Sequence, residues 1–266
     1  MNSLPVALTI AGSDSSAGAG IQADLKTFMA LNVYGVSAIT SITAQNTTGI
    51  NEIYDLPGFL VYRQIKSIAD DIKIDAVKTG MLSNAEIIDN VALAIKDFHL
   101  DKLIVDPVLH SKDNSELLKR NSLNDFKEKI LPLALVITPN ISEAQLLSGI
   151  EISTKDDMIK VAEKLIKLGP EYIVIKGGHL LINEKVFDLI FSENTIEFLE
   201  YPRINTINTH GIGCTFSAAI TAFIAKGYDV ISSIKNARNY IQSALQNEIK
   251  IGKGFGPLNH RWLWKE

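Results

Sequence analysis

Residues 208–215 read Asn-Thr-His-Gly-Ile-Gly-Cys-Thr and stand directly before a helical pattern over Phe216–Gly227. Apolar residues recur in that pattern at intervals of three and four, which is typical of one buried helix face. A lysine and a glycine at its end are the usual stop signals of a helix. The sequence therefore predicts that Gly211, Gly213 and Cys214 lie at the amino terminus of a helix.

A helix amino terminus that carries two glycines is suited to binding an anion. Its first N–H groups have no partner within the helix, and the helix dipole places about half a positive charge there. At Gly211 and Gly213 no Cβ keeps a charged ligand away from the backbone. Phosphate is the commonest such anion, so we expect a phosphate site here. A loop that only begins a helix would contain the same Gly-x-Gly, and the rest of the chain must decide between the two.

Upstream of this stretch, short apolar segments alternate with helical patterns, which is typical of an α/β fold with a mostly parallel sheet and helices on both faces. No linker, repeat or low-complexity segment interrupts the alternation, so we predict one domain over residues 1–266. The predicted strands are Val6–Ala11, Val36–Thr43, Ala76–Lys78, Lys102–Val105, Leu133–Ile137 and Tyr172–Ile175, followed by a hairpin of Val186–Phe191 and Thr195–Leu199. The main predicted helices are Ile65–Ile72, a helix capped by Asn84 that runs to about Phe98, Ser115–Ile130, Ser142–Leu147, Thr154–Leu168 and Asp229–Ile249.

Polar or glycine residues follow nearly every predicted parallel strand. In open α/β sheets, ligands bind outside the carboxyl ends of the strands. We therefore expect these residues to meet the Gly211–Cys214 run at one edge of the sheet, with Ala44–Gly49 as a polar loop beside them. They are Gly12–Ser13, Gln45, Lys78–Thr79–Gly80, Asp106, Asn140 and Lys176–Gly177–Gly178.

An anion site, a lysine and separated carboxylates on one rim are what phosphoryl transfer requires. Lys176 is expected to contact a nucleotide phosphate, and Asp106 and Glu143 are expected to hold Mg²⁺, partly through water. Each also has an ordinary structural explanation: a lysine at a strand end, an aspartate in a turn, and a glutamate that caps a helix. The chain contains no Gly-x4-Gly-Lys-Ser/Thr sequence, which excludes a P-loop enzyme, and its early glycines do not have the spacing of an NAD site.

Cys214, the sole cysteine, has two predicted roles at the helix start. A helix amino terminus lowers the pKa of a thiol from about 8.5, so we expect a thiolate fraction near pH 7 that would make Cys214 a general base. Its backbone N–H would donate to an anion in either protonation state. A small buried cysteine that only packs the helix start is the structural alternative.

The histidines do not indicate a metal centre. No spacing of histidine, cysteine and glutamate suggests a zinc site. His99 and His260 are expected at the surface or in the tail, and His210 is expected to order its loop rather than take part in chemistry.

The composition argues against a nucleic-acid or membrane partner. The 266 residues are 46% hydrophobic and 21% charged, with a formal net charge of −4, which does not favour a polyanionic partner. No apolar run approaches the length of a membrane span, and no signal peptide is evident. A single cysteine fits a reducing compartment. We therefore expect a cytoplasmic protein.

Several longer motifs are distributed along the whole chain. They are Ala11–Asp24, Thr43–Thr47, Lys78–Met81, Asp106–Val108, Thr138–Asn140 with Glu143–Ala144, Lys176–His179, Thr209–Thr215 and Gly256–His260. In these motifs, and over essentially its full length, the chain resembles the hydroxymethylpyrimidine/phosphomethylpyrimidine kinases of thiamine biosynthesis, which have a ribokinase-like three-layer fold. That resemblance implies ATP- and Mg²⁺-dependent phosphorylation of 4-amino-5-hydroxymethyl-2-methylpyrimidine and then of its monophosphate, by a homodimer.

The resemblance also implies a set of pyrimidine-binding residues. Gln45 would bind the aminopyrimidine, because a carboxamide offers a donor and an acceptor side by side. Met81 and Val108 would pack against the ring, and Gly12 and Ala19 would line the floor of the pocket.

The nucleotide site is implied in the same way. Lys176 would contact the ATP phosphates, while Gly211, Gly213 and Cys214 would form an anion hole. Cys214 would stand where sugar kinases of this fold carry an aspartate base. Two other functions remain open: a pyridoxal or pyridoxine kinase on the same scaffold, and a non-catalytic protein that binds a pyrimidine.

Overall fold

The computed structural model describes residues 4–111, 116–178 and 185–264. In this part of the chain, nine strands form one sheet in the order β3-β2-β1-β4-β5-β6-β7-β8-β9. The six strands from β2 to β7 in this order are parallel, and β3, β8 and β9 are antiparallel to their neighbours. The predicted α/β class and the six predicted parallel strands are thereby confirmed.

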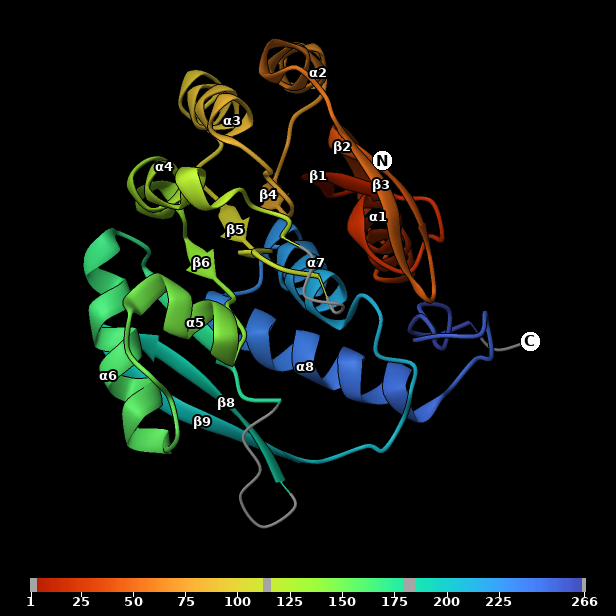
Figure 1. Cartoon of the computed structure of the whole chain (residues 1–266), viewed down its shortest axis with the longest axis vertical. Coiled ribbons are helices and arrows are strands. Elements are labelled where there is room, and N and C mark those ends of the chain that lie inside the picture. Colours follow the sequence, from red (N-terminus) through yellow and green to blue (C-terminus); the bar gives the residue numbers. More distant parts are fainter. Residues whose placement is uncertain (1–3, 112–115, 179–184, 265–266) are drawn as a thin grey trace.

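Strands and helices alternate along most of the chain (Figure 1). Among the described residues, no helix combines the length and the apolar character needed to cross a bilayer. The strands are β1 Val6–Asp14, β2 Tyr34–Asn46, β3 Gly49–Asp55, β4 Ala76–Thr79, β5 Leu103–Val105, β6 Val136–Ile137, β7 Tyr172–Lys176, β8 Lys185–Ser192 and β9 Thr195–Pro202. The helices are α1 Gly20–Ala30, α2 Gly58–Ala69, α3 Ala85–Asp97, α4 Leu123–Lys129, α5 Ile141–Ser148, α6 Lys155–Leu165, α7 Ile212–Ala225 and α8 Val230–Gln246, with short 3-10 turns at Arg120–Ser122, Leu131–Leu133 and Ile166–Leu168.

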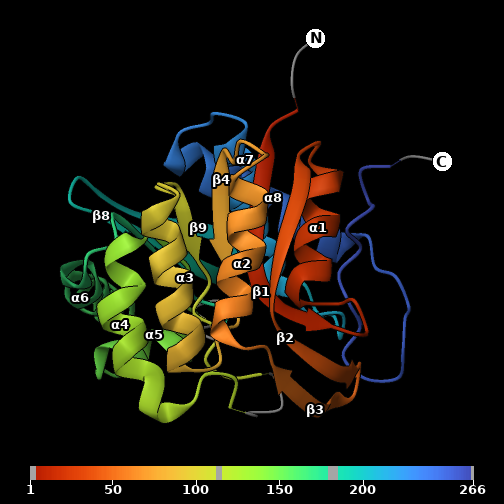
Figure 2. The ribbon, with the colours of Figure 1, turned by 90° about the horizontal axis from the view of Figure 1, so that it is seen from above.

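Helices cover both faces of the sheet because successive strand residues point to opposite sides. In β5, Leu103 and Val105 pack in the core beneath α2 to α6, whereas Ile104 packs in the core beneath α1, α7 and α8. Figure 2 shows α2, α3 and α4 side by side on one face, with α7 and α8 behind the sheet. These two cores make the fold three-layered.

Side-chain caps begin several helices where the sequence predicts them. Asn84 accepts a hydrogen bond from the N–H of Ile87 at 3.1 Å, which confirms the predicted cap of α3. Asn140 and Glu143 form a reciprocal capping box at the start of α5. The structural explanation offered for Glu143 is therefore correct, although it does not exclude a second role.

Several predicted boundaries are wrong. The helix predicted over Ile65–Ile72 begins earlier, at Gly58, and ends at Ala69. Residues 44–46 continue β2 and pair with β3, a strand not predicted, so the expected polar loop is a hairpin. The helix predicted over Ser115–Ile130 is α-helical only at Leu123–Lys129, while Glu116 pairs with His110 in a β-bridge and residues 112–115 lie outside the described residues. The central helix begins at Ile212 rather than Phe216, because Gly211 caps it.

Candidate active site

The Gly211 backbone begins α7 and packs against the loop after β1. Gly211 has φ of +78°, a left-handed conformation that favours glycine. A Cβ at this position would lie 1.9 Å from the carbonyl oxygen of Gly18 and 3.2 Å from the Cα of Ala19. The first turn of α7 is thus held directly against the loop after β1, which carries the predicted site residue Ala19.

Gly213 faces the charged ends of two strands. A Cβ on Gly213 would lie 3.2 Å from Lys176 Nζ and 3.6 Å from Asp106 Oδ2. Lys176 Nζ lies 3.0 Å from Asp106 Oδ1, and both side chains are largely buried. The structure therefore brings the end of β5, the end of β7 and the start of α7 to one point, as expected from the strand ends.

Glu143 adds a second carboxylate to this cluster. Burial and the neighbouring charge of Asp106 raise the pKa of Glu143 to about 7, although Lys176 opposes that effect. The pKa of Asp106 is lowered instead: burial raises it, but the ammonium groups of Lys176 and Lys78 more than compensate. Lys176 acts on both carboxylates, and a cation bound beside them would favour the ionised form of Glu143.

The donor set fits Mg²⁺ bound partly by substrate. Within the described ranges, no group of three or more histidine, cysteine, aspartate or glutamate side chains forms a metal cluster. Mg²⁺ commonly takes only one or two carboxylates from the protein and completes its shell with water and phosphate oxygens. Asp106 and Glu143 are hard oxygen donors near the start of α7, so they fit this mode.

The predicted pyrimidine residues gather around the ends of β1, β2 and β4. A Cβ on Gly12 would lie 3.2 Å from the sulfur of Met81, so these two residues are in contact. The backbone N–H of Gln45 donates to Ser15 Oγ at 2.8 Å, which holds the Gln45 segment against the loop after β1. Val108 lies half-buried after β5, where its N–H donates to the carbonyl oxygen of Asp106 at 2.9 Å.

His210 connects the Gln45 segment with the loop after β1 and the start of α7. Its Nε2 lies 2.8 Å from Asp14 Oδ2 and 3.3 Å from the side-chain nitrogen of Gln45. Although burial opposes ionisation of Asp14, hydrogen bonds from His210, Ser16 and Ala19 lower the pKa of this carboxyl to about 2. His210 therefore orders its loop, as expected. Because His210 directly precedes Gly211 in the chain and contacts Gln45, it also brings Gln45 close to the start of α7.

Sequence reasoning did not assign Asp14 a role. The available signal was a single acidic residue in a run of glycine, serine and alanine immediately after a strand. Such residues commonly accept hydrogen bonds from loop N–H groups. Asp14 accepts from the N–H groups of Ser16, Gly18 and Ala19, so it shapes the whole glycine-rich loop.

The expected pKa of Cys214 is wrong in direction. Burial raises the pKa of this thiol to about 12, and the charges of Asp106 and Asp24 act in the same direction. Lys78 opposes them but forms a fully buried ion pair with Asp24 at 2.8 Å, so its charge is largely neutralised. Desolvation thus outweighs the helix dipole, and Cys214 is a neutral thiol near pH 7.

The expected position of His260 is also wrong. It was expected at the surface or in the tail, but it is buried, and its Nε2 lies 2.9 Å from Thr215 Oγ1 in the first turn of α7. Burial lowers the pKa of His260 to about 4, so it is neutral and contributes a hydrogen bond rather than a charge. No local pattern in the tail indicates this contact.

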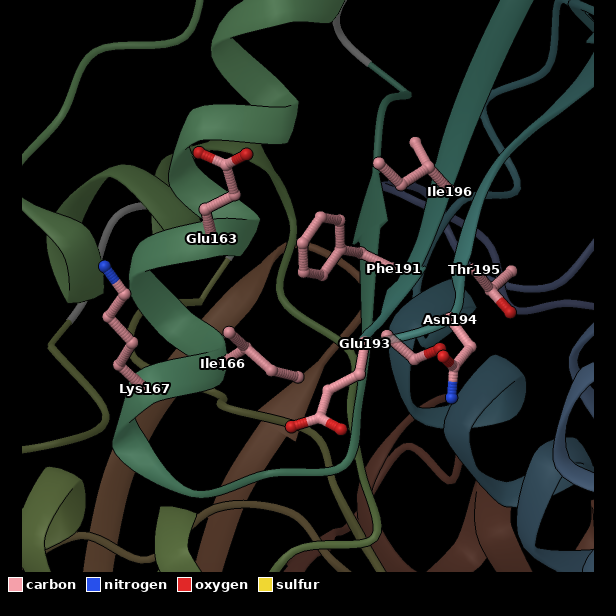
Figure 3. A pocket seen from close by; sticks show the side chains of 9 residues that line it. Glu163, Ile166, Lys167, Phe191, Glu193, Asn194, Thr195 and Ile196 are labelled. Carbon is pink, nitrogen blue, oxygen red and sulfur yellow. The ribbon is translucent and has the colours of Figure 1, made fainter.

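The hollow in Figure 3 is not this site. It has a volume of about 550 Å³ and lies between Ile166 and the turn from β8 to β9. Phe191, which lines it, pairs with Ile173, near the opposite end of β7 from Lys176. None of the predicted site residues lines this hollow.

Comparison with known proteins agrees with the geometry. A family model described as phosphomethylpyrimidine kinase matches residues 14–259. The hydroxymethylpyrimidine/phosphomethylpyrimidine kinase of Bacillus subtilis is 46% identical over 96% of this chain and 94% of its own length. A pyridoxine kinase of the same organism is 44% identical over 98% of this chain and 97% of its own length.

A solved structure extends the similarity to the fold. The pyridoxal kinase from Staphylococcus aureus in complex with ADP superposes with a TM-score of 0.90 at 36% identity, covering 98% of this chain and 95% of that one. This agreement confirms the ribokinase-like architecture. A family match over most of the chain, together with relatives of this identity and coverage, shows that the chain belongs to the phosphomethylpyrimidine kinase family and is a kinase.

Proposed function

We propose that the protein transfers the γ-phosphoryl group of ATP to 4-amino-5-hydroxymethyl-2-methylpyrimidine and then to the resulting monophosphate. The observation that carries this proposal is the contact of His210 with Gln45 on one side and its adjacency to Gly211 on the other. A ring bound at Gln45 would hold its hydroxymethyl group next to the anion-binding start of α7. A coupled assay of ADP release with each pyrimidine tests the proposal, and the absence of turnover with both would refute it.

On the nucleotide side, we assign the phosphates to Lys176 and to the N–H groups of Gly211, Gly213 and Cys214. Lys176 offsets phosphate charge, and the helix start donates hydrogen bonds without reorganisation, which favours the transition state. Asp106 and Glu143 would hold Mg²⁺, which supplies further neutralisation of the transferring phosphate when bound. Catalysis then rests on positioning and electrostatics.

Replacing Gln45 by alanine is expected to raise the KM for the pyrimidine about tenfold or more, because a buried polar edge of the ring would lose its partner. The KM for ATP should stay within about twofold, since in this proposal Gln45 contacts the pyrimidine and not the nucleotide. Steady-state kinetics with each substrate varied in turn measures both constants. Equal increases in the two constants would instead mean that the loop has collapsed.

Cys214 acts in this proposal through its backbone N–H. Since the pKa of the thiol is raised to about 12, the thiolate becomes abundant only in strongly alkaline solution. The rate of Cys214 alkylation by iodoacetamide should therefore keep rising with pH up to at least 10, and kcat should show no ionisation near 8.5. A plateau of alkylation at pH 8–9, together with a Cys214→Ala variant of greatly reduced kcat, would restore the thiolate as general base.

A pyridoxal or pyridoxine kinase is the second candidate, because the matches include kinases of that name at similar identity. Both substrate classes are planar heteroaromatic rings with a hydroxymethyl group. The ratio of kcat/KM for hydroxymethylpyrimidine and for pyridoxal distinguishes them. A non-catalytic pyrimidine-binding protein is not supported, because the chain belongs to a family of kinases and keeps the cluster of Lys176, Asp106 and Glu143.

We further propose that the whole chain forms one domain and acts in the cytoplasm as a homodimer. The resemblance to the family motivates the dimer. Ile42 and Tyr54 pair across β2 and β3 at the edge of the sheet and are 49% and 65% exposed, which offers an apolar surface to a second copy. Light scattering of the purified protein measures its molar mass and so tests the homodimer.

A further inference from the structure

A buried charged pair, Asp188 and Arg238, lies next to the site without belonging to the cluster described above. Asp188 is in β8 opposite Lys176 and is 0% exposed. Arg238 is in α8 and is 9% exposed, and its Nη2 donates to Asp188 Oδ2. The two residues therefore join the hairpin beside β7 to the helix layer below it.

The second carboxylate oxygen of Asp188 reaches the backbone directly after Lys176. Asp188 Oδ1 accepts a buried hydrogen bond from the N–H of Gly177 at 3.0 Å. A Cβ on Gly177 would lie 1.8 Å from the carbonyl oxygen of Phe187, so the backbone passes in close contact with β8 at this point. Asp188 thus determines where the chain leaves β7, immediately behind the Lys176 side chain.

Arg238 extends the same connection to α7. Its guanidinium carbon lies 4.2 Å from the ring centre of Tyr201 and 5.1 Å from that of Phe216. Phe216 is buried and stands two residues after Cys214 in the first turns of α7. One buried network therefore connects the backbone at Lys176 with the helix start that carries Gly213.

The stability of the fold alone does not explain why the charges of Asp188 and Arg238 are buried. Burying two charges costs about as much solvation as their attraction returns, and apolar replacements of similar volume are often as stable. An apolar pair would, however, leave the N–H of Gly177 without its acceptor. We propose that Asp188 and Arg238 are positioning residues that hold the Lys176 ammonium in register with the N–H groups of Gly211–Cys214. This inference rests on the nucleotide site of the proposed function.

Two double variants separate positioning from folding. Asp188→Asn with Arg238→Gln keeps an acceptor for Gly177 N–H and removes both charges. Asp188→Leu with Arg238→Met removes the charges and the acceptor, yet leaves no unpaired buried ion. Single replacement of Asp188 is avoided, because the remaining Arg238 charge would be buried alone and the chain could fail to fold.

The readouts are the Kd of Mg·ADP by calorimetry, the KM values of both substrates, and the Tm. The Leu/Met variant is expected to bind Mg·ADP about tenfold more weakly, because the buried N–H of Gly177 loses its acceptor. The Asn/Gln variant keeps that acceptor, so its Kd should stay within about threefold of the original value. The KM for the pyrimidine should not change in either variant. Glu197→Gln is the matched control, because it removes the exposed Lys235–Glu197 pair that joins the same helix to the same hairpin.

Two results would overturn the inference: equal Mg·ADP affinity in the two double variants, or a pyrimidine KM that changes as much as the Kd of Mg·ADP. These outcomes are distinct from failure of the proposed function. If the original protein turns over no pyrimidine but the Leu/Met variant binds Mg·ADP selectively more weakly, the substrate assignment is wrong and the positioning role stands.

Discussion

Replacing Lys176 by methionine is expected to lower kcat/KM for Mg·ATP by about 10²–10³-fold, the range found when one group that stabilises transition-state charge is removed. Methionine has a similar length but no charge, so Asp106 would lose the ammonium that now lies 3.0 Å from it. The KM for the pyrimidine should stay within about twofold, because in the proposed function Lys176 contacts the nucleotide phosphates and not the pyrimidine. Steady-state kinetics with ATP and the pyrimidine varied separately measures both effects.

Lys185→Met is the matched control for this experiment. Lys185 begins the neighbouring strand β8, is exposed, and pairs with Glu200 at the surface. Exposed ion pairs contribute little to stability, so this variant should keep the original kinetics and Tm. A Lys176→Met protein that retains a third or more of the original kcat/KM would show that the nucleotide phosphates bind elsewhere.

Gly213→Ala is expected to have opposite effects on activity and on stability. Alanine favours a helix over glycine by about 0.5–1 kcal/mol, so the Tm should be unchanged or rise by about 1–3 °C. The added methyl group would stand 3.2 Å from Lys176 Nζ, in the space between the ammonium and the helix start. We expect kcat/KM for Mg·ATP to fall by on the order of 100-fold, as when an oxyanion donor becomes inaccessible.

Gly149→Ala provides the reverse pattern. Gly149 ends α5 in a left-handed conformation with φ of +70°, and apart from its own chain neighbours no atom of the described residues lies within 4 Å of the position of a Cβ. Alanine there costs about 1–2 kcal/mol of backbone strain without touching the site, so the Tm should fall and the kinetics should not change. Full activity of Gly213→Ala would mean that the γ-phosphoryl group does not pass between Gly213 and Lys176.

The strands and helices could be predicted where their pattern is local. The six parallel strands are short apolar runs bounded by glycine and polar residues, and each was recognisable on its own. β3 contains no fully buried residue and is held mainly by pairing with β2, so its own sequence carries little signal. The segment at Glu116 resembles a helix in composition, but its pairing with His110 gives it another conformation.

The candidate site was predictable to the extent that topology follows from the order of elements. Because all parallel strands end at one edge of the sheet, Asp106, Lys176 and the run Gly211–Cys214 had to meet there. The contacts of Gln45 with His210 join residues 165 positions apart, and no spacing rule specifies such a pair. Tertiary packing decides which of the polar residues at the edge touch one another.

The sequence by itself determined the alternation of strands and helices, the edge of the sheet at which the predicted site residues meet, and the glycines at the start of α7. These properties depend on local periodicity and on the absence of a side chain. Only the tertiary structure decided the protonation of Cys214, the burial of His260 and the connection from Asp188 to Lys176. Desolvation and buried hydrogen bonds depend on every neighbour in space, and those neighbours come from distant parts of the chain.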